Sequence, residues 1–188
     1  MLNFGDIADK ALVAKVGISY VSIDGAKQNL ADGSAHNSQQ FKRYSLFSLW
    51  DTFRALHPLL TISNGERVND MVSSMVAFYE ETGLLPSWDL MANETDVMIG
   101  YHAVPVIVDA YFKGLTDVDP ELLFQALKAS AMQARFGIDL FAKYGYVPSD
   151  LEVEAVSKTL EYAFDDWAIA RMAKALNKDV DYAYFTQR

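Results

Sequence analysis

The pattern of apolar and polar residues changes character near residue 44 of this 188-residue chain. Residues 11–23 are rich in β-branched side chains with partial alternation, which is typical of a strand. Residues 24–43 are polar and contain two Asp-Gly turn signals, which favours a linker. From Tyr44 onward, apolar residues recur mainly at helical spacing, which predicts about six helices joined by short polar loops.

The clearest helical pattern lies in residues 68–79, where Gly83 follows as the expected C-cap. An earlier helix is predicted around residue 50, with Pro58 as its stop signal. The stripe of the earlier helix comprises Leu46, Leu49, Trp50, Phe53 and Leu56. The stripe of the later helix comprises Val68, Met71, Val72, Met75, Val76 and Tyr79.

Two helices are predicted in the middle of the chain. Residues 97–113 are apolar almost all round, which indicates a buried helix with Pro105 in its first turn or at a kink. The run Asp119-Pro120-Glu121 combines a capping aspartate, a proline at the first helical position and an acid in the first turn. The helix that it starts is expected to reach about Arg135.

The last predicted helices begin at Ser149 or Asp150, which serve as alternative caps, and near Asp179. The apolar stripe of the first of them runs to about Leu176 and comprises Val156, Leu160, Ala163, Trp167 and Ala170. Long helices that alternate between amphipathic and fully buried suggest two layers, either an inner and an outer ring or stacked pairs. The predicted fold class is therefore mainly α.

Composition excludes several kinds of function. The net charge of −9 argues against a nucleic-acid partner, which requires a basic face. There is no cysteine, so neither disulfides nor thiolate chemistry are expected. The sequence contains no apolar run long enough to span a membrane, and the first ten residues lack the basic region of a signal peptide.

Tryptophan and aspartate are adjacent at three places, Trp50-Asp51, Trp88-Asp89 and Asp166-Trp167. Aromatic faces beside carboxylates suit carbohydrate, because the ring covers the C–H face of a sugar while acids bind its hydroxyls. Two carboxylates that flank a glycosidic bond are also what hydrolysis requires. Clustering therefore indicates an acidic, sugar-binding cleft.

Structural roles remain open for each of these residues. Acids in residues 94–96 could complement the positive end of a helix dipole, and residues 93–95 match a glycosylation sequon only by pattern. A histidine such as His102 on an apolar helix is more often a hydrogen-bonded core residue than a ligand. The tryptophans are more often core residues than sugar platforms.

Long segments of the chain strongly resemble glycoside hydrolase family 92, which comprises calcium-dependent, inverting, exo-acting α-mannosidases. The resemblance is carried by YSLFSLWDTFRALHPLLTI, LPSWDLMANETDVMIGYHAVPVIVDAYFKG, YGYVP and VSKTLEYAFDDWAIARMAKALNK. It implies that residues 44–188 form part of an (α/α)6 toroid, the family's catalytic domain. Residues 1–31 then correspond to a remnant of the family's N-terminal β-sandwich, and residues 32–43 to a linker.

The resemblance also implies roles for individual residues. Glu94 in the NET motif corresponds to the family's general acid. A loop carboxylate that is partly desolvated against a buried helix can hold a proton and donate it to the leaving oxygen. This role would explain an acid at the start of an apolar segment.

Other residues are expected to bind substrate or metal. Glu161 in TLEYA resembles a calcium ligand or a sugar contact, and calcium favours a carboxylate-rich site. Asp51, Trp88, Asn93 and His102 are expected to line the sugar pocket, although Trp88 could equally pack. The implied cofactor is Ca²⁺, and the implied partner is an α-mannoside oligosaccharide or glycan, with neither nucleic acid nor membrane involved.

Two departures from the family pattern matter for activity. Early toroid helices and most of the sandwich are missing, and the Asp-rich GGNDD…GQMSAW segment that supplies the general base has no counterpart. Asp165 or Asp166 could substitute as the base. The sequence therefore predicts an α-mannosidase, or alternatively an incomplete fragment that acts as a non-catalytic helical or carbohydrate-binding module.

A shortened toroid should also expose helix faces that promote self-association. Another helical-toroid glycosidase is a third hypothesis, which the length of the matching motifs disfavours. Relatives are typically periplasmic or secreted, but no signal peptide is recognised, so localisation stays open.

Overall fold

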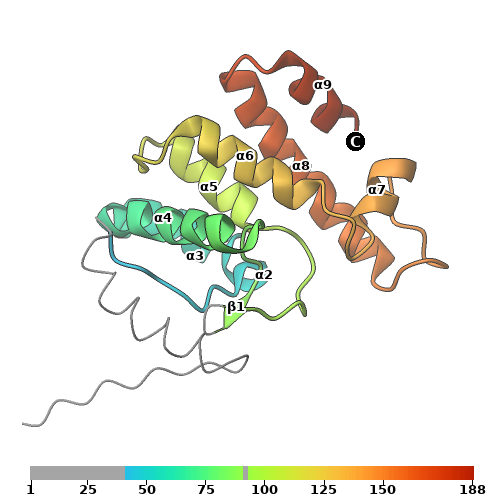
Figure 1. Cartoon of the computed structure of the whole chain (residues 1–188), viewed down its shortest axis with the longest axis horizontal. Coiled ribbons are helices and arrows are strands. Elements are labelled where there is room, and N and C mark those ends of the chain that lie inside the picture. Colours follow the sequence, from blue (N-terminus) through green and yellow to red (C-terminus); the bar gives the residue numbers. More distant parts are fainter. Residues whose placement is uncertain (1–40, 91–92) are drawn as a thin grey trace, which may run out of the picture. The chain divides into compact units, whose positions relative to one another are not determined.

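The computed structural model describes residues 41–90 and 93–188, which belong to one unit, Phe41–Arg188. This part is mainly α, with eight helices and one two-stranded sheet, which confirms the predicted fold class (Figure 1). The strand predicted at residues 11–23 and the sandwich remnant predicted at residues 1–31 lie outside the described residues. The same is true of most of the predicted linker.

Helices α5 and α8 form the centre of the unit. Helix α8 packs against α5, α6, α7 and α9, while α4 packs against α3, α5 and α6 (Figure 1). The two short strands form an antiparallel pair next to the α2 segment. The helices are α2 (Leu49–Thr52), α3 (Leu56–Ser63), α4 (Gly65–Thr82), α5 (Ala103–Phe112), α6 (Pro120–Ala131), α7 (Ile138–Tyr144), α8 (Ala155–Ala175) and α9 (Asp179–Gln187). The strands are β1 (Asp89–Leu90) and β2 (Asn93–Glu94).

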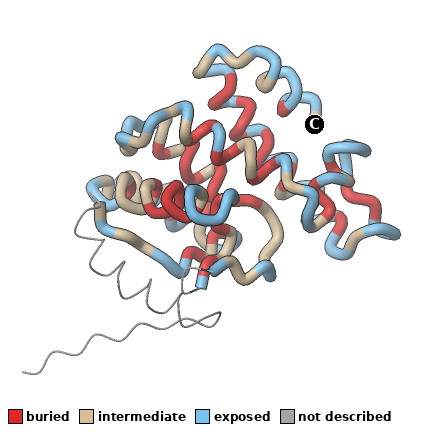
Figure 2. Tube along the Cα trace, viewed as in Figure 1, coloured by how far each residue is buried: buried red, intermediate tan, exposed pale blue. Residues whose placement is uncertain are grey.

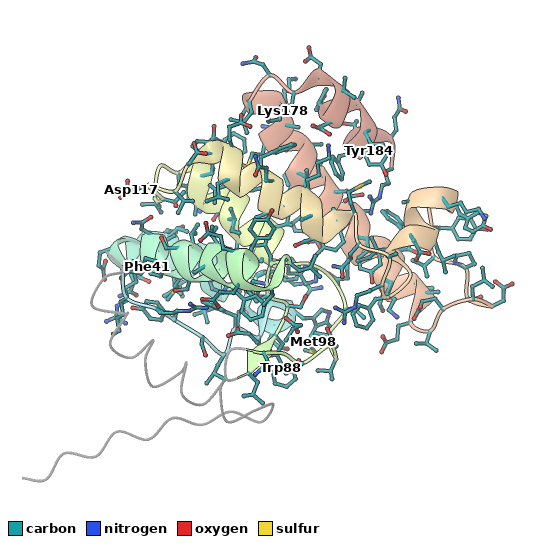
Figure 3. The ribbon with its side chains drawn as sticks, viewed as in Figure 1. Phe41, Trp88, Met98, Asp117, Lys178 and Tyr184 are labelled. Carbon is teal, nitrogen blue, oxygen red and sulfur yellow. The ribbon has the colours of Figure 1, made fainter. Side chains whose placement is uncertain are left out.

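The hydrophobic core lies mainly between α4, α5, α6 and α8. Figure 3 shows how densely side chains fill the space between these helices. Val72, Met75, Ile107, Leu123 and Leu127 are all fully buried there. Among the described residues, no helix is both long and apolar enough to cross a lipid bilayer.

Two predictions about helix ends are confirmed. Gly83 ends α4 in the left-handed conformation at φ 86°, which a glycine adopts without steric cost. At the start of α6, the Asp119 side chain accepts the backbone N–H of Leu122 at 3.1 Å, and Pro120 occupies the first helical position. The predicted stripe of α4 also faces the core, with Val68, Val72, Met75 and Val76 buried and its other two members packed against them.

The predicted helix around residue 50 is wrong in two respects. It is split into α2 and α3, and Leu46 lies outside both with a left-handed φ of 66°. Pro58 does not stop a helix, because it sits in the first turn of α3, where a missing N–H costs no intrahelical bond. Leu46, Trp50 and Leu56 are exposed, so only Leu49 and Phe53 of this stripe are buried.

Other helix boundaries also differ from the predictions. Helix α5 begins at residue 103 rather than 97, with Pro105 in its first turn, which is one of its two predicted places. Helix α6 ends at residue 131, and α7 follows as a separate helix that the sequence pattern did not reveal. Neither Ser149 nor Asp150 caps α8, which begins after Glu154 in the left-handed conformation.

The predicted buried stripe of α8 is largely wrong. Val156, Leu160 and Trp167 are 76%, 67% and 57% exposed. Of the five residues of the predicted stripe, only Ala170 is buried. Lys158, Asp165 and Asp166 are buried instead, on the side of α8 that packs against the rest of the unit (Figure 2). Helix α8 therefore buries three charged residues beside apolar ones such as Tyr162, Ile169 and Met172, and it exposes most of the predicted apolar stripe.

Candidate active site

Glu94 lies in strand β2, opposite Asp89 of strand β1. Its carboxylate accepts backbone N–H groups of Ser87 at 2.7 Å, Trp88 at 3.1 Å, Thr95 at 3.0 Å and Asp96 at 3.3 Å. These hydrogen bonds connect several main-chain groups of the loop to one side chain. In this geometry the carboxylate acts as an acceptor of main-chain hydrogen bonds.

The neighbouring predicted residues are not enclosed with Glu94. Asn93 is exposed, and Trp88 is half-buried in the loop beside β1 (Figure 3). Asp51 is exposed in α2 and accepts a hydrogen bond from the Ser48 hydroxyl. The described geometry therefore does not bring Asp51 into contact with Glu94.

Asp89 is a buried acid for which the sequence analysis proposed no separate role. It is 3% exposed, and its carboxylate accepts the backbone N–H groups of Leu46 at 3.2 Å and Phe47 at 2.9 Å. Burial raises the pKa of Asp89, while these hydrogen bonds oppose the shift. Asp89 thus fastens the segment before α2 to the loop that carries Glu94. The repeated Trp-Asp pair was the sequence signal that could have singled it out.

His102 connects two acids of α8. Its Nδ1 lies 2.8 Å from Oδ1 of Asp165, and its Nε2 lies 3.0 Å from Oε2 of Glu161. The imidazole is 1% exposed and stacks on Phe53 with ring centroids 3.9 Å apart. Arg54 forms a further ion pair with Glu161. The structure therefore brings together two predicted residues, His102 and Glu161, and adds Arg54, which no pattern had singled out.

The second acid pair of α8 is part of a deeper network. Tyr101 donates its backbone N–H to Asp165 at 2.9 Å and its hydroxyl to Asp166 at 2.6 Å. Nε of Arg188 lies 2.9 Å from the other oxygen of Asp166. Burial raises the pKa of Asp165 and raises that of Asp166 to about 7. No sequence pattern indicated Arg188 as a partner, because it lies 22 positions from Asp166.

Both acids suggested as an alternative base are enclosed by protein. Asp165 and Asp166 are 0% and 1% exposed, and their oxygens are directed to His102, Tyr101 and Arg188. A general base in an inverting glycosidase must contact the attacking water. This arrangement instead suits residues that hold α5 and α9 on α8.

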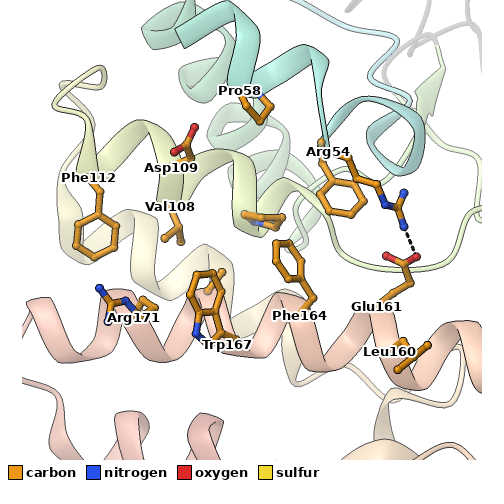
Figure 4. Close-up of a pocket in the computed structure, with 13 residues that line it drawn as sticks. Arg54, Pro58, Val108, Asp109, Phe112, Leu160, Glu161, Phe164, Trp167 and Arg171 are labelled. Atoms are coloured by element: carbon orange, nitrogen blue, oxygen red, sulfur yellow. Dashed lines mark hydrogen bonds and ion pairs between the residues drawn. The ribbon is translucent and has the colours of Figure 1, made fainter. Parts of the chain in front are cut away.

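A groove of about 660 Å³ lies between α3, α5 and α8 (Figure 4). Arg54 and Glu161 lie at one end of it, and Phe112 and Arg171 lie at the other. Its walls between these ends are mainly apolar. They comprise Phe53, Pro58, Pro105, Val108, Leu160, Phe164, Trp167 and Ala168.

A second cavity of about 120 Å³ contains Glu94. It is lined by the loop that carries Glu94, by the end of α4, by the segment between α6 and α7 that contains Arg135, and by Ile138 of α7 and Tyr162 of α8. Glu161 does not line this cavity, and Glu94 does not line the larger groove. The predicted acid and the predicted metal or sugar ligand therefore open into different spaces.

The described residues do not fit a calcium ion as they stand. Calcium takes six to eight oxygen ligands, but no group of three or more acidic or histidine side chains in residues 41–90 and 93–188 could hold a metal. The one candidate ligand, Glu161, is engaged by the Arg54 guanidinium and the His102 imidazole. Neither group can supply an oxygen to a cation.

Comparison with known proteins places this fold in a family. Residues 15–188 match the glycosyl hydrolase family 92 catalytic domain. An α-mannosidase of family 92 from Bacteroides thetaiotaomicron has 45% sequence identity and a TM-score of 0.76, and its complex with mannoimidazole matches equally well. The match covers 79% of this chain and 20% of that protein.

Two further relatives give the same picture. An inverting family 92 mannosidase from the same organism has 35% identity and a TM-score of 0.69, over 78% of this chain and 21% of its own. An uncharacterized secreted glycosidase from Arthroderma benhamiae is 25% identical, over 54% of this chain and 15% of its own. The chain thus spans about a fifth of the length of the solved relatives. Its helices are those of a partial (α/α)6 toroid, as predicted.

Proposed function

The chain belongs to glycosyl hydrolase family 92, and on that premise we propose that it serves the hydrolysis of terminal α-linked mannose with inversion. The observation that carries the proposal is the 45% identity, with a TM-score of 0.76, to a family 92 α-mannosidase over 79% of the chain. The NET motif and the acids of α8 lie within the matched family domain. Export to the periplasm or the medium is part of the proposal, in line with a relative described as secreted.

Glu94 is the general acid in this proposal. It lines the 120 Å³ cavity, and one of its oxygens would turn from the main chain toward the leaving oxygen when substrate binds. The proton moves from that oxygen to the glycosidic oxygen as the bond to the sugar breaks. We assign Trp88 and Asn93 to the border of the sugar site, because they lie in the same segment of the chain as Glu94.

Glu161 and its partners form the second part of the proposed site. The carboxylate lies at the polar end of the larger groove, where Arg54 and His102 fix its orientation. We assign to it hydrogen bonds with sugar hydroxyls, with His102 as its support and Asp51 as a further contact from α2. Calcium assistance stays in the proposal only with ligands beyond the group around Glu161, and no step is routed through the ion.

The test is the release of free mannose from an α-1,2-linked mannobiose, measured with added calcium and again with EDTA. We expect calcium-dependent release, and we expect the Glu94→Gln variant to lose about 10²–10⁴-fold in rate, the usual contribution of a general acid. The matched control is Glu80→Gln, an exposed glutamate of α4. Undiminished release by Glu94→Gln would exclude Glu94 as the acid.

A second candidate function is a helical carbohydrate-binding module without turnover. Two observations favour it: Glu94 and Glu161 open into different cavities, and Asp165 and Asp166 are buried away from both. In that case mannobiose would bind to the folded chain, and no mannose would be released with or without calcium. Calorimetric titration combined with the release assay separates the two functions.

A further inference from the structure

Gly100 lies between the two parts of the proposed site. It lines the 120 Å³ cavity that contains Glu94, and two residues later His102 contacts Glu161, which lines the larger groove. The φ of Gly100 is 83°, in the left-handed region that a glycine adopts without steric cost. Gly100 therefore borders one cavity directly and is connected to the other through His102.

The imidazole of His102 occupies the place where a side chain of residue 100 would begin. A Cβ atom at Gly100 would lie 2.6 Å from Cε1 and 2.7 Å from Cδ2 of this ring, and closer still to Nε2. Carbon atoms in favourable contact are roughly 3.5–4.0 Å apart. The ring would therefore have to move by about 1 Å to admit even a methyl group.

The ring has little freedom to move, because other groups hold it. Its Nδ1 lies 2.8 Å from Oδ1 of the fully buried Asp165, and the ring stacks on Phe53 with centroids 3.9 Å apart. The imidazole itself is buried. A side chain at position 100 would therefore displace the Nε2 edge of the ring, which is the edge that contacts Glu161 at 3.0 Å.

Backbone conformation alone does not explain this arrangement. Gly114 and Gly145 also have a positive φ, but a Cβ atom at either of them would meet nothing within 4 Å. Gly137 does have a close neighbour, but it is Cγ of Glu152, a half-buried residue with a flexible side chain. Among the glycines of residues 41–90 and 93–188, only Gly100 has the place of its side chain taken by a buried ring.

The main chain of Gly100 is connected to Glu94. The carbonyl of Gly100 accepts a hydrogen bond from the Ser87 hydroxyl at 3.1 Å, and the Ser87 N–H donates to Glu94 at 2.7 Å. Both bonds use groups that an alanine at position 100 would keep. Adding a side chain there should therefore disturb Glu161 more than Glu94.

We propose that Gly100 is a positioning residue of this site, since the absence of a side chain there allows His102 to hold Glu161 in place for the sugar. This role rests on the proposed function, in which Glu161 binds sugar hydroxyls. A functional group has to stay within about 0.5 Å of its productive position, so a displacement of about 1 Å in its support is large enough to matter.

The first experiment tests the contact without substrate, by urea denaturation. Gly100→Ala should lower the urea midpoint more than Gly145→Ala, which adds the same methyl group at a φ of 75° in open space. In a His102→Ala background, which lacks the ring, the two substitutions should have equal effects. If Gly100→Ala alone does not fold, the double variant should fold as His102→Ala does. Equal effects with His102 present would contradict the proposal.

The second experiment observes the ring itself. The chain contains three histidines, so protein labelled with ¹⁵N-histidine gives three sets of imidazole signals. The set that His102→Ala removes should shift in Gly100→Ala and should stay in place in Gly145→Ala. An unshifted His102 signal in a folded Gly100→Ala protein would overturn the proposal.

The third experiment measures binding and release of α-1,2-linked mannobiose. Gly100→Ala should weaken binding by about 10-fold, which corresponds to one hydrogen bond with a charged group. KM should change more than kcat, because Glu94 keeps its main-chain partners. Gly145→Ala should leave both constants unchanged, because Gly145 lines neither cavity.

The outcomes separate this role from the proposed function. If the wild-type chain neither binds nor cleaves mannobiose, the proposed function fails, and the role of Gly100 fails with it. If the wild type binds mannobiose and Gly100→Ala binds it equally well, only the role of Gly100 fails. The double variant with His102→Ala should have the stability of His102→Ala without the affinity of the wild type. Recovery of full affinity in that variant would show that Gly100 acts on stability alone.

Discussion

Each of the two faces of α8 carries some residues that are unusual for their location. The inner face buries Lys158, Asp165 and Asp166, whereas the outer face exposes Leu160 and Trp167. Each buried charge has an oppositely charged or hydrogen-bonding partner within 3 Å. The comparison shows that charged residues can lie on the buried face of this helix, beside apolar Tyr162, Ile169 and Met172, because each of them has a partner there.

The difference also separates two kinds of stability. The inner face is held by specific pairs, which are costly to break singly because one partner is left buried and unpaired. The outer face lines a groove with exposed apolar walls. These side chains contribute little to the free energy of unfolding of the isolated chain, because they would be stabilising only if another surface covered them. Substitutions on the inner face should therefore lower the free energy of unfolding much more than substitutions on the outer face.

The largest decrease in the free energy of unfolding is expected for Asp165→Ala. The substitution removes the acceptor of the Tyr101 N–H and of the His102 ring, both of which stay buried. We expect the free energy of unfolding to fall by about 3 kcal/mol, the usual cost of stranding buried hydrogen-bonding and charged groups. Urea denaturation measures it, with Ser157→Ala on the exposed face as the control. A loss below about 1 kcal/mol would show that the buried pairs do not hold α8.

A smaller decrease in the free energy of unfolding is expected for Arg188→Ala. The variant leaves the Asp166 carboxylate without its cationic partner, which should cost about 2 kcal/mol near pH 8. Near pH 5 the cost should shrink, because a carboxyl whose pKa is about 7 takes up a proton and is no longer an unpaired buried charge. Thermal unfolding at both pH values tests this. The idea fails if the loss is equal at the two pH values.

The pH dependence of stability sharpens the comparison further. The pKa of Asp166 is about 7 in the folded chain, against 3.8 for an ordinary aspartate. Between these values the folded state binds more protons than the unfolded state, so stability falls as pH rises, by at most about 1.4 kcal/mol per pH unit. Asp166→Asn should remove this component of the slope.

The titration of His57 changes stability with pH in the opposite direction, so its contribution must be separated from that of Asp166. Burial lowers its pKa from 6.5 to about 4, so between these values the unfolded state binds more protons. Its contribution to stability is therefore present above pH 6.5 and is lost as pH falls toward 4. A His57→Gln background isolates the Asp166 component. The assignment is refuted if Asp166→Asn leaves the slope unchanged in that background.

The smallest effect is expected for Trp167→Ala. At protein concentrations where the chain is monomeric, the free energy of unfolding should change by less than about 0.5 kcal/mol, as at ordinary surface positions. Trp167 lies two residues from Asp165, so the pair compares the two faces within one helical turn. A loss as large as that of Asp165→Ala would mean that the outer face is already covered within the chain.

Much of the helical framework could be predicted from the sequence. Helix α4 was found because its apolar residues lie on one side, and α6 because Asp119 and Pro120 mark its start. The face of α8 could not be assigned, since apolar residues occur on both of its sides and the spacing alone favours neither. The prediction from Pro58 was wrong because a proline can occupy the first turn of a helix as well as the position after its last turn.

The candidate site was only partly predictable. The resemblance pointed to Glu94, Glu161 and His102, and the structure joins the last two through a contact of 3.0 Å. Asp165 lies four residues after Glu161 on the same helix, whereas Arg54 and His102 come from elsewhere in the sequence, and only the folded chain brings them to these acids. Whether a given acid accepts main-chain hydrogen bonds, as Glu94 does, depends on loop geometry that side-chain patterns do not encode.

The way in which Glu94 organises its loop has a consequence for evolution. The carboxylate recognises Ser87, Trp88 and Asp96 through N–H groups, which every amino acid except proline provides. A position such as Trp88 can therefore change its side chain without disturbing the main-chain scaffold that surrounds the acid. Natural drift or a laboratory library could vary the side chains around Glu94 while the carboxylate keeps its place.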